Sequence, residues 1–409
     1  MLVTYRYKLR LRSGQYARMA QLCEMQRQLY NAALEERIGA WSKARHSVTR
    51  LDQQKSLTEI RQADPEGHGS LPVNMGRWTL KRVEDATTGF FSRVKRGQKA
   101  GFPRFKGRHR WRSFGMLEAS GMQLRGQYLI LKGTGRAIRM NLHRPLPADA
   151  KIKGATFTLH GRHWFVSLQV ESAEIIAEQA PTGPSIGLDV GVEHLATWSD
   201  GAVDGHIPNV RPRSCREREL RRAQRALARC RRGSRRRTKV RERLARLHRA
   251  IGNARDTHLH QQAERLARSH KLIVIERLQV RNMLRSAAGT VAEPGTNVRA
   301  KSGLNRSILD ASMAKFLQYL RYKAERAGIA VLEVRAAGTS QLCSGCGAKV
   351  PKTLSIRRHC CACGLDLQRD INAARVILSR GLPAEGVQPL GQPNVADHGV
   401  RAAGTLLAA

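Results

Sequence analysis

The spacing of apolar residues changes several times along the first third of the chain. Residues 2–12 (LVTYRYKLRLR) alternate apolar and basic positions, which is typical of a strand with one basic face. Residues 15–46 and 74–96 instead place apolar side chains at helical spacing, with Leu22 and Leu29 in the first run. The polar stretch ADPEGHGSLP lies between the two runs. These patterns predict one strand followed by two helices.

From residue 101 onward the pattern becomes that of short antiparallel strands. The runs QYLILKG, AIRMNL, ATFTLHG and HWFVSLQVE alternate apolar and polar positions and are separated by glycine-containing turns. We interpret these runs as a small β-barrel. The segment APTGP at 180–184 is typical of a linker and predicts a boundary there.

The second half of the chain, residues 185–335, alternates strand and helix patterns. SIGLDVGVEHLATWSDG predicts two strands, residues 214–269 predict an Arg-rich helical segment, and KLIVIERLQV predicts a buried strand. Residues 306–327 predict a helix, and IAVLEVRA predicts another strand. This alternation predicts an α/β domain. The tail beyond residue 381 is rich in Gly, Pro and Ala, so we expect it to be poorly ordered.

The charge balance indicates a polyanionic partner. The 409 residues include 73 Lys and Arg but only 32 Asp and Glu, which gives a formal net charge of +41. Such an excess repels itself unless a polyanion neutralises it, so we expect nucleic acid as the partner. The start, MLVTYRYKLRLR, has no apolar signal-peptide core, and the apolar runs are short. We therefore expect a cytoplasmic protein with no membrane partner and no small-molecule substrate.

Most of the cysteines crowd into one short segment, which predicts a metal site. Two CxxC pairs with zinc-ligand spacing are formed by Cys343, Cys346, Cys360 and Cys363. Four thiolates in this arrangement are typical of a structural Zn²⁺ site with no open coordination position. Free thiols or a redox pair are the alternative. Cys361 adjoins Cys360 and could replace it, although the x2 spacing favours Cys360.

Three acidic residues stand at the ends of predicted core elements. Asp189 lies in the apolar run IGLDVGV, Glu276 ends LIVIE, and Asp370 opens DINAARVIL. An ionised carboxylate is costly in such a setting unless it is paired or bound to metal. Singly, the three could be a turn acid, a surface residue at a strand end and a helix N-cap. Together they favour a site for two Mg²⁺ (or Mn²⁺) ions about 4 Å apart that supports phosphodiester hydrolysis.

Two basic segments are candidate nucleic-acid-binding surfaces. Residues 211–250 are dominated by Lys and Arg, and a solvated helical face is the alternative interpretation. GFPRFKGRHRWRSF interleaves basic residues with Phe102, Phe105, Trp111 and Phe114, which suits base stacking and phosphate contact, although some of these rings could belong to the barrel core. The candidate contacts are Arg104, Lys106, Arg108, Arg110, Arg112, Arg231, Arg232, Arg235, Arg236 and Arg237.

Five segments, taken in order, resemble one known family, TnpB. They are GLDVGVEHLATWSDG, VIERLQVRNM, LNRSILDASMAKFLQYLRYKAERAG, TSQLCSGCG and CGLDLQRDINAARVIL. The N-terminal YKLRL and YNAAL segments and GFPRFKGRHRWRSF match more weakly, so the resemblance extends over essentially the whole chain. The family consists of transposon-encoded RNA-guided endonucleases, which are related to compact type V CRISPR effectors and are often labelled transposases.

The resemblance implies a fold, a function and partners. The fold would be a RuvC-like (RNase H-like) nuclease domain with Asp189, Glu276 and Asp370 as its acids and with the zinc finger as an insertion that binds the target nucleic acid. The partners would be a guide RNA from the transposon end and double-stranded target DNA beside a short flanking motif, in a prokaryotic cytoplasm. The implied boundaries are 1–12 for the first strand of a wedge β-barrel, 13–98 for a helical recognition region, 99–180 for the rest of the barrel, 181–337 and 365–381 for the nuclease parts, 338–364 for the finger and 382–409 for a flexible tail.

The chain departs from the family pattern in several places. Gln368 replaces the first aspartate of the usual DRD, AAGTSQ lacks the common preceding proline, and Met313 stands where an aromatic residue is common. The loop before Cys360 is one residue short. None of these changes removes one of the three acids, so we expect cleavage activity. The alternatives are a DNA-joining transposase, a guided repressor that does not cut, and an RNA-binding structural protein.

Overall fold

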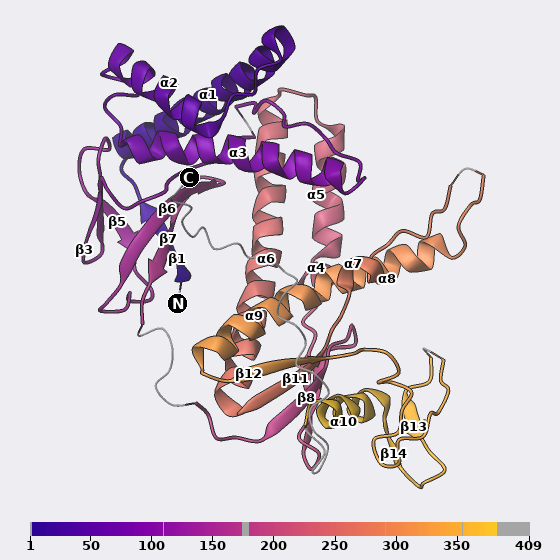
Figure 1. Cartoon of the computed structure of the whole chain (residues 1–409). Helices are drawn as coiled ribbons and strands as arrows, with labels where there is room; N and C mark the ends of the chain where they lie inside the picture. The colour runs from indigo at the N-terminus through magenta and orange to yellow at the C-terminus, as the bar shows by residue number, and fades with distance from the viewer. Residues whose placement is uncertain (1, 109, 174–179, 291, 354, 383–409) are drawn as a thin grey trace. The chain divides into compact units, whose positions relative to one another are not determined.

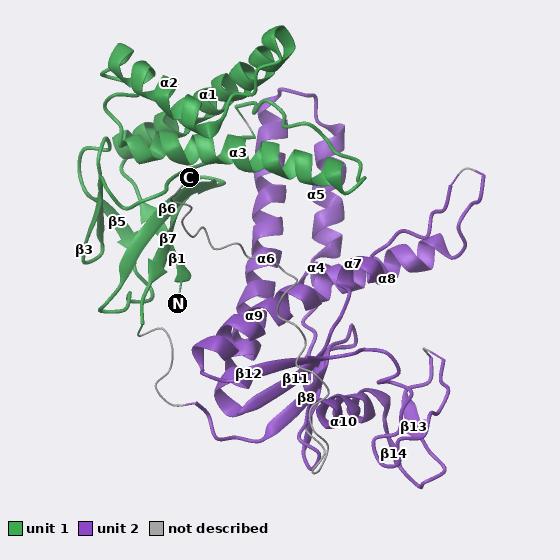
Figure 2. Cartoon of the chain, viewed as in Figure 1, with its two compact units in different colours: residues 1–175 green, residues 176–409 purple. Residues whose placement is uncertain are grey.

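The computed structural model divides the chain into two compact units, residues 1–175 and 176–409 (Figures 1 and 2). The described residues are 2–108, 110–173, 180–290, 292–353 and 355–382. The division falls close to the predicted linker at 180–184. The tail predicted to be flexible lies outside the described residues, except for Leu382.

Unit 1 begins with one strand and three helices. Strand β1 spans Leu2–Arg10, and the helices are α1 (Ser13–Ala44), α2 (Arg50–Ala63) and α3 (Val73–Lys95). The two helices predicted from periodicity, α1 and α3, are confirmed. Helix α2 was not predicted, because it buries only Gln53 and Leu57 and its sequence shows little amphipathic pattern.

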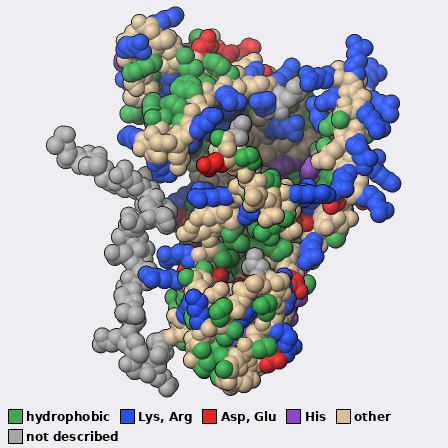
Figure 3. All heavy atoms as spheres, turned by 90° about the vertical axis from the view of Figure 1, so that its right-hand side faces the viewer, with side chains coloured by type: hydrophobic (Ala, Val, Ile, Leu, Met, Phe, Trp, Pro, Cys, Tyr) green, Lys and Arg blue, Asp and Glu red, His purple; other side chains and the backbone are tan. Residues whose placement is uncertain are grey.

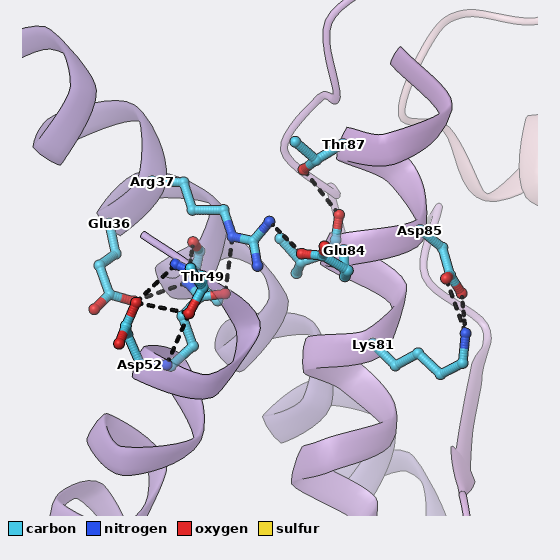
Figure 4. Close-up of polar contacts among 11 residues, drawn as sticks. Glu36, Arg37, Thr49, Asp52, Lys81, Glu84, Asp85 and Thr87 are labelled. Carbon is cyan, nitrogen blue, oxygen red and sulfur yellow. Dashed lines mark hydrogen bonds and ion pairs between the residues drawn. The ribbon is translucent and has the colours of Figure 1, made fainter. Parts of the chain in front are cut away.

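Polar contacts join these three helices and fix where α2 begins (Figure 4). Thr49 and Asp52 form a capping box, in which the Thr49 Oγ1 atom accepts from the Asp52 backbone N–H at 3.3 Å and Asp52 Oδ2 accepts from the Thr49 backbone N–H at 2.9 Å. Arg37 on α1 pairs with Glu84 on α3 at 2.7 Å and donates to Gln53 on α2 at 3.0 Å. One guanidinium group therefore contacts all three helices.

The strands of unit 1 form one antiparallel sheet in the order β2-β6-β7-β1-β5-β4-β3. In β1, the buried residues Tyr5, Tyr7 and Leu9 alternate with basic residues, which confirms the strand with one basic face. The other strands are β2 (Ser113–Met116), β3 (Met122–Arg125), β4 (Tyr128–Leu131), β5 (Ile138–Asn141), β6 (Lys151–His160) and β7 (His163–Glu171).

The sheet that was expected to form a β-barrel remains open among the described residues. The edge strands β2 and β3 have four residues each and do not pair with one another. Helices α1 and α3 pack against β2, and the buried face of the sheet shares one apolar core with Leu22 and Leu29 of α1 and Leu80 of α3. Helices therefore bury the apolar face that closure of a barrel would otherwise have buried.

Unit 2 is built on a five-stranded sheet in the order β10-β9-β8-β11-β12. The strands are β8 (Ser185–Asp189), β9 (His194–Ser199), β10 (Asp204–Pro208), β11 (Leu272–Glu276) and β12 (Ala330–Val334). Strand β9 is antiparallel to both of its neighbours, whereas β11 runs parallel to β8 and β12. The predicted strands in this half are confirmed, and β10 is an additional strand.

Two helices of unit 2 depart from their predicted extents. The Arg-rich segment forms α4 (Pro212–Cys215), α5 (Glu217–Arg229) and α6 (Arg235–Ser269), because the chain turns back at Gly233, which has a φ of +84°. The helix predicted at 306–327 is divided into α8 (Val298–Ala311) and α9 (Met313–Arg326) by Ser312 in the left-handed conformation. The remaining helices are α7 (Val280–Met283) and α10 (Arg369–Gly381). Among the described residues, no helix is long and apolar enough to cross a lipid bilayer.

Helices cover both faces of this sheet (Figure 1). Ile186 and Leu188 on β8, with the matching residues of β11, pack against α6, α8 and α9 in one apolar core. Val274 on β11 points to the opposite face and packs against Ile377 and Leu378 of α10. Because both faces are covered, the two central strands read as continuous apolar runs.

Helix α10 lies directly on the backbone of β8 at Gly187. A Cβ atom at this position would lie 2.0 Å from the carbonyl oxygen of Ala374 and 2.6 Å from the backbone nitrogen of Leu378. Only glycine allows this approach. This contact between α10 and β8 also sets the position of Asp370 relative to Asp189. Asp189 follows Gly187 by two residues on the same face, and Asp370 precedes Ala374 by one helical turn.

Gly187→Ala is expected to destabilise the protein by about 1–3 kcal/mol, because the added methyl group meets main-chain atoms that cannot move without displacing α10. The matched control is Gly252→Ala within α6, where a Cβ atom would meet nothing within 4 Å. That change is expected to stabilise the protein by about 0.4–1 kcal/mol. Urea denaturation of both variants measures the difference. Equal midpoints for the two variants would contradict the close packing of α10 on β8.

Candidate acidic site and metal centre

The fold brings the three predicted acids into one region of unit 2. Asp189 ends β8 and Glu276 ends β11, and the parallel register pairs Leu188 with Ile275. Residues matched in parallel strands point to the same face, so Asp189 and Glu276 lie beside one another on the face that carries α10. Asp370 is the second residue of α10, not its N-cap, which is Gln368. The three residues therefore come from three separate segments of the chain.

The electrostatics of the site show an excess of negative charge. Burial of its carboxyl group, together with the negative charges of Glu276 and Asp370, raises the pKa of Asp189 to about 8, while Arg369 acts in the opposite direction. Burial also raises the pKa of Glu276, despite the hydrogen bond from Thr339 and the positive charge of Arg380. Titratable groups perturbed in this way are typical of functional sites.

Asp370 and Glu276 each form a hydrogen bond with a neighbouring side chain. Asp370 Oδ1 accepts from Arg369 Nε at 3.2 Å. Glu276 is 8% exposed and accepts a hydrogen bond from the Thr339 hydroxyl group. The three carboxylates do not converge as tightly as a preformed metal cage. Among the described residues, only the cysteines bring three or more ligand atoms within 4.8 Å of one another.

That cysteine cluster consists of Cys343, Cys346, Cys361 and Cys363. The Sγ atoms of Cys343 and Cys363 are 3.6 Å apart, and those of Cys346 and Cys361 are 3.5 Å apart. A tetrahedron with Zn–S bonds of about 2.3 Å places sulfur atoms about 3.8 Å apart, so the cluster fits a zinc ion. Four sulfur ligands favour a soft divalent ion of this kind.

Cys360, predicted as the third ligand, lies outside this cluster, and Cys361 lies within it instead. Cys360 is the last residue of β13 (Arg358–Cys360), which pairs with β14 (Asp366–Gln368), and its Sγ atom contacts Asp366 Oδ1 at 3.2 Å. Side chains alternate along a strand, so Cys360 points away from the side on which His359 is buried. Cys361 follows the strand, where its backbone N–H bonds to the Leu365 carbonyl at 2.9 Å and begins the turn.

The cluster is supported by main-chain donors. Burial opposes ionisation, but hydrogen bonds from the backbone N–H groups of Cys346 and Gly345 lower the pKa of the Cys343 thiol to about 6. A lowered thiol pKa favours the thiolate, which is the form that binds metal. Gly347 and Gly364 have φ values of +74° and +88°, as the two turns require.

Two further residues near these sites were not predicted. Thr339 contacts Glu276, as described, and Asn372 on α10 is fully buried with its side chain bonded to the loop beside Cys343. A signal for Asn372 was present in the sequence. It is a polar residue at a helical position surrounded by buried apolar residues, and a buried amide needs specific partners.

The basic segment at 101–112 lies in unit 1 and divides into two parts. Trp111 and Phe114 are buried in the core, whereas Phe102 and Phe105 are about half exposed. Main-chain contacts at Lys106 attach the loop to α1, because Asn31 bonds both to its N–H and to its carbonyl group. The exposed basic side chains of this segment are Arg104, Arg108, Arg110 and Arg112.

The Arg-rich turn between α5 and α6 lies in unit 2. Arg237 has a structural role, since its guanidinium group donates to the carbonyl oxygens of Leu227 at 2.8 Å and Cys230 at 3.0 Å at the end of α5. The exposed basic side chains at this turn are Arg231, Arg232, Arg235 and Arg236. On the face displayed in Figure 3, Lys and Arg side chains cover much more of the surface than Asp and Glu side chains.

Two family models match separate parts of the chain. The model described as a probable transposase, OrfB of IS605, matches residues 166–287. The TNB domain of Cas12f1-like proteins matches residues 314–377. The first match contains Asp189 and Glu276, and the second contains the cysteine cluster and Asp370.

Comparisons with individual relatives agree with these matches. The chain is 36% identical over 305 residues to the "Putative RNA-guided DNA endonuclease InsQ" of Escherichia coli K12, covering 74% of this chain and 73% of that protein. It is 30% identical over 398 residues to a "Putative RNA-guided DNA endonuclease" of Streptomyces pristinaespiralis, covering 94% and 92%. It is also 31% identical over 149 residues to the "TnpB-like protein L79" of Acanthamoeba polyphaga mimivirus, covering 36% and 27%.

A solved structure shares the fold. The cryo-EM structure of a Cas12f1–sgRNA–target DNA complex matches with a TM-score of 0.54 and 13% sequence identity, covering 88% of this chain and 81% of that chain. Identity at this level supports the fold alone, and the family assignment rests on the longer and more similar relatives. The chain belongs to the TnpB family, and two of its relatives carry the name "Putative RNA-guided DNA endonuclease".

Proposed function

We propose that this protein is an RNA-guided DNA endonuclease that hydrolyses a phosphodiester bond of its target at Asp189, Glu276 and Asp370. One observation carries the assignment: three acids from distant segments lie near one another at the carboxyl ends of the central strands β8 and β11 and the start of α10, where burial and the charges of Glu276 and Asp370 raise the pKa of Asp189 to about 8. Arg369 pairs with Asp370, and Arg380 acts on Glu276, yet the pKa of Asp189 stays raised, so these cations do not offset the three acids.

The residues present fit a divalent cation. All three side chains offer oxygen ligands, which suit Mg²⁺ or Mn²⁺ better than soft metals. Asp189, Glu276 and Asp370 would hold the ions, and Thr339 would keep the Glu276 carboxylate oriented. When bound, the ions would supply Lewis-acid polarisation of the phosphate and an activated water molecule. The cysteine cluster would hold a structural Zn²⁺, because its four thiolates leave no open position.

The family's domain plan is part of the proposal. Residues 1–12 and 99–180 would form the wedge domain, 13–98 the recognition region, 181–337 and 365–381 the RuvC-like nuclease, and 338–364 the target-binding finger. Two observations support this plan. Strand β1 pairs with β5 and β7, although α1, α2 and α3 separate it from them in the sequence. The cysteine cluster lies between β12 and α10 in the sequence.

The proposed partners are a guide RNA from the transposon end and double-stranded target DNA. The similar solved structure is a complex with sgRNA and target DNA. In such proteins the sequence is read by base pairing, and the protein holds the heteroduplex through its backbone. The net charge of +41 and the exposed arginines of both segments suit that role.

Replacing Arg231, Arg232, Arg235 and Arg236 by glutamine is expected to weaken guide-RNA binding and its salt dependence. Each lost phosphate contact should reduce the slope of log K against log salt by about 0.7–0.9. Arg237→Gln should mainly lower the melting temperature instead, because this residue caps the end of α5. Filter binding across a salt series measures the slopes. An unchanged slope in the fourfold variant would remove the turn from the nucleic-acid-binding surface.

The proposal is tested by expressing the protein from its own locus with flanking DNA and sequencing the RNA that purifies with it. One discrete RNA, with a constant part and an end derived from outside the element, is expected. A smear of cellular RNA would contradict guidance and leave the basic surface as a general polyanion binder.

The family model described as a probable transposase favours a second candidate function, which is the joining of DNA ends. Joined rather than merely cut products would support that alternative.

A further inference from the structure

The segment 335–344 (RAAGTSQLCS), here called the strap, connects β12 to the first cysteine pair. Helix α10 holds it at both ends. Arg380, in the last turn of α10, donates to the carbonyl oxygens of Arg335 at 2.6 Å and Ala337 at 3.0 Å. Asn372, in the first turn, donates to the Leu342 carbonyl at 2.7 Å and accepts from the Ser344 N–H at 2.9 Å. The strap therefore cannot move independently of α10.

Asn372 links the helix that carries Asp370 to the loop that carries Cys343. Its side chain is fully buried, and both halves of the amide are satisfied by the main chain on either side of Cys343. Breaking such a pair of bonds leaves buried polar groups unpaired, which destabilises the arrangement. The position of the first cysteine loop and that of the first turn of α10 are thus fixed together.

Thr339 links the middle of the strap to the second acid. It is 4% exposed, and its hydroxyl group donates to the Glu276 carboxylate. The preceding residue, Gly338, has a φ of +79°, and its carbonyl oxygen accepts from the backbone N–H groups of Gln341 and Leu342 at 2.9 Å each. This tight turn sets the distance along the chain between Thr339 and Cys343.

We propose that the strap couples the metal bound by the cysteines to the geometry of the acidic site, with Thr339 and Asn372 as positioning residues. Metal binding fixes Cys343, the strap then holds Thr339 against Glu276, and Asn372 holds the first turn of α10, which carries Asp370. The finger would thus stabilise the nuclease site as well as contact nucleic acid. Coupling of this kind is reciprocal, so each site should change the metal affinity of the other by the same factor. The inference rests on the proposed function, because it takes the acids to bind divalent cations.

The direct test measures Mn²⁺ affinity at the acids by electron paramagnetic resonance, before and after a chelator removes the metal from the cysteines. The protein–guide RNA complex is used throughout. Wild type should bind Mn²⁺ about tenfold more weakly after removal, within the usual range of coupling between sites. Asn372→Asp keeps the acceptor for Ser344 but loses the donor to Leu342, so its Mn²⁺ affinity should change much less on metal removal.

A second measurement follows zinc release to a colorimetric chelator. Asn372→Asp should release the ion about tenfold faster, because partners outside the ligand sphere typically contribute factors of this size. The matched control is Asn74→Asp in unit 1. Asn74 is also buried and donates to the carbonyl oxygens of Glu118 at 2.8 Å and Ser120 at 3.0 Å. Its replacement should leave zinc release unchanged.

Thr339 is tested by the pair Thr339→Val and Thr339→Ser. The valine variant keeps the shape but loses the hydroxyl donor, so Mn²⁺ affinity and cleavage should both fall about tenfold with target binding unchanged. The serine variant should restore both quantities. Unchanged Mn²⁺ affinity in zinc-depleted wild type would overturn the coupling, even if Asp189→Ala abolished cleavage and the proposed function stood. Cleavage by Asp189→Ala would instead show that the proposed function had failed.

Discussion

Asp189→Ala is expected to abolish cutting of target DNA while guide RNA and target DNA remain bound. The carboxyl group lies at the end of β8, where Glu276 and Asp370 are its acidic neighbours. A loss of at least about 10³-fold in cleavage rate is expected, which corresponds to about 4 kcal/mol in the activation barrier. Single-turnover cleavage of a labelled duplex gives the rate, and a gel-shift assay gives the binding.

The loss should not arise from unfolding. Burial and the neighbouring negative charges raise the pKa of Asp189 to about 8, so this group lowers the stability of the metal-free protein as the pH rises from the ordinary carboxyl range toward 8. Its removal should leave the melting temperature unchanged or higher. The control is Asp256→Ala, which deletes an acid of α6 that pairs with Lys315 at 2.6 Å and lies outside the trio. That variant should cut normally. A wild-type rate in Asp189→Ala would show that the site has been assigned wrongly.

Cys361→Ser is expected to lose the metal ion of the finger, whereas Cys360→Ser should retain it. Cys361 lies with its sulfur 3.5 Å from that of Cys346, while Cys360 points toward Asp366 on the neighbouring strand. Structural zinc contributes on the order of 10 kcal/mol or more to folding of small domains, so removing one ligand should also release the finger from its folded state. Elemental analysis of the purified proteins measures the metal content.

The two serine variants are matched, because they change adjacent cysteines by the same single atom. Equal zinc content in both would mean that either thiol can complete the cluster. Zinc lost only from Cys360→Ser would show that Cys360 is the ligand, as the CxxC spacing predicts. It would contradict the arrangement of the turn after β13. The Cys361 result also bears on the strap, since an empty cluster should weaken Mn²⁺ binding at the acids.

The strongly patterned elements could be predicted from the sequence. Alternation identified β1, helical spacing identified α1 and α3, and continuous apolar runs identified β8 and β11. These elements were predictable because the faces that an element buries determine the spacing of its apolar residues. The three acids stood out because a carboxylate at the end of a buried run is costly without a function. Resemblance to a family added their common role, which no local pattern contains.

Other features depended on contacts between distant segments. Helix α2 carries almost no apolar pattern, and only its contacts with α1 and α3 account for its position. The edge strands leave the sheet of unit 1 open, because helices bury the face that a closed barrel would have buried. The helix predicted at 306–327 divides at Ser312, where the backbone enters the left-handed region, a change that side-chain periodicity does not encode.

The metal centre shows most clearly which features the sequence predicts and which depend on tertiary contacts. The sequence by itself predicted a metal site from the spacing of the cysteines and placed three acids at the ends of core elements. Only the tertiary structure decided between Cys360 and Cys361, because the choice depends on which face of β13 each side chain occupies once β14 is paired. It also decided that Asn372 and Thr339 join the two sites. The physical reason is that ligand direction and buried hydrogen bonds are set by pairing and packing between segments distant in the chain, whereas sequence patterns report only the local burial of each residue.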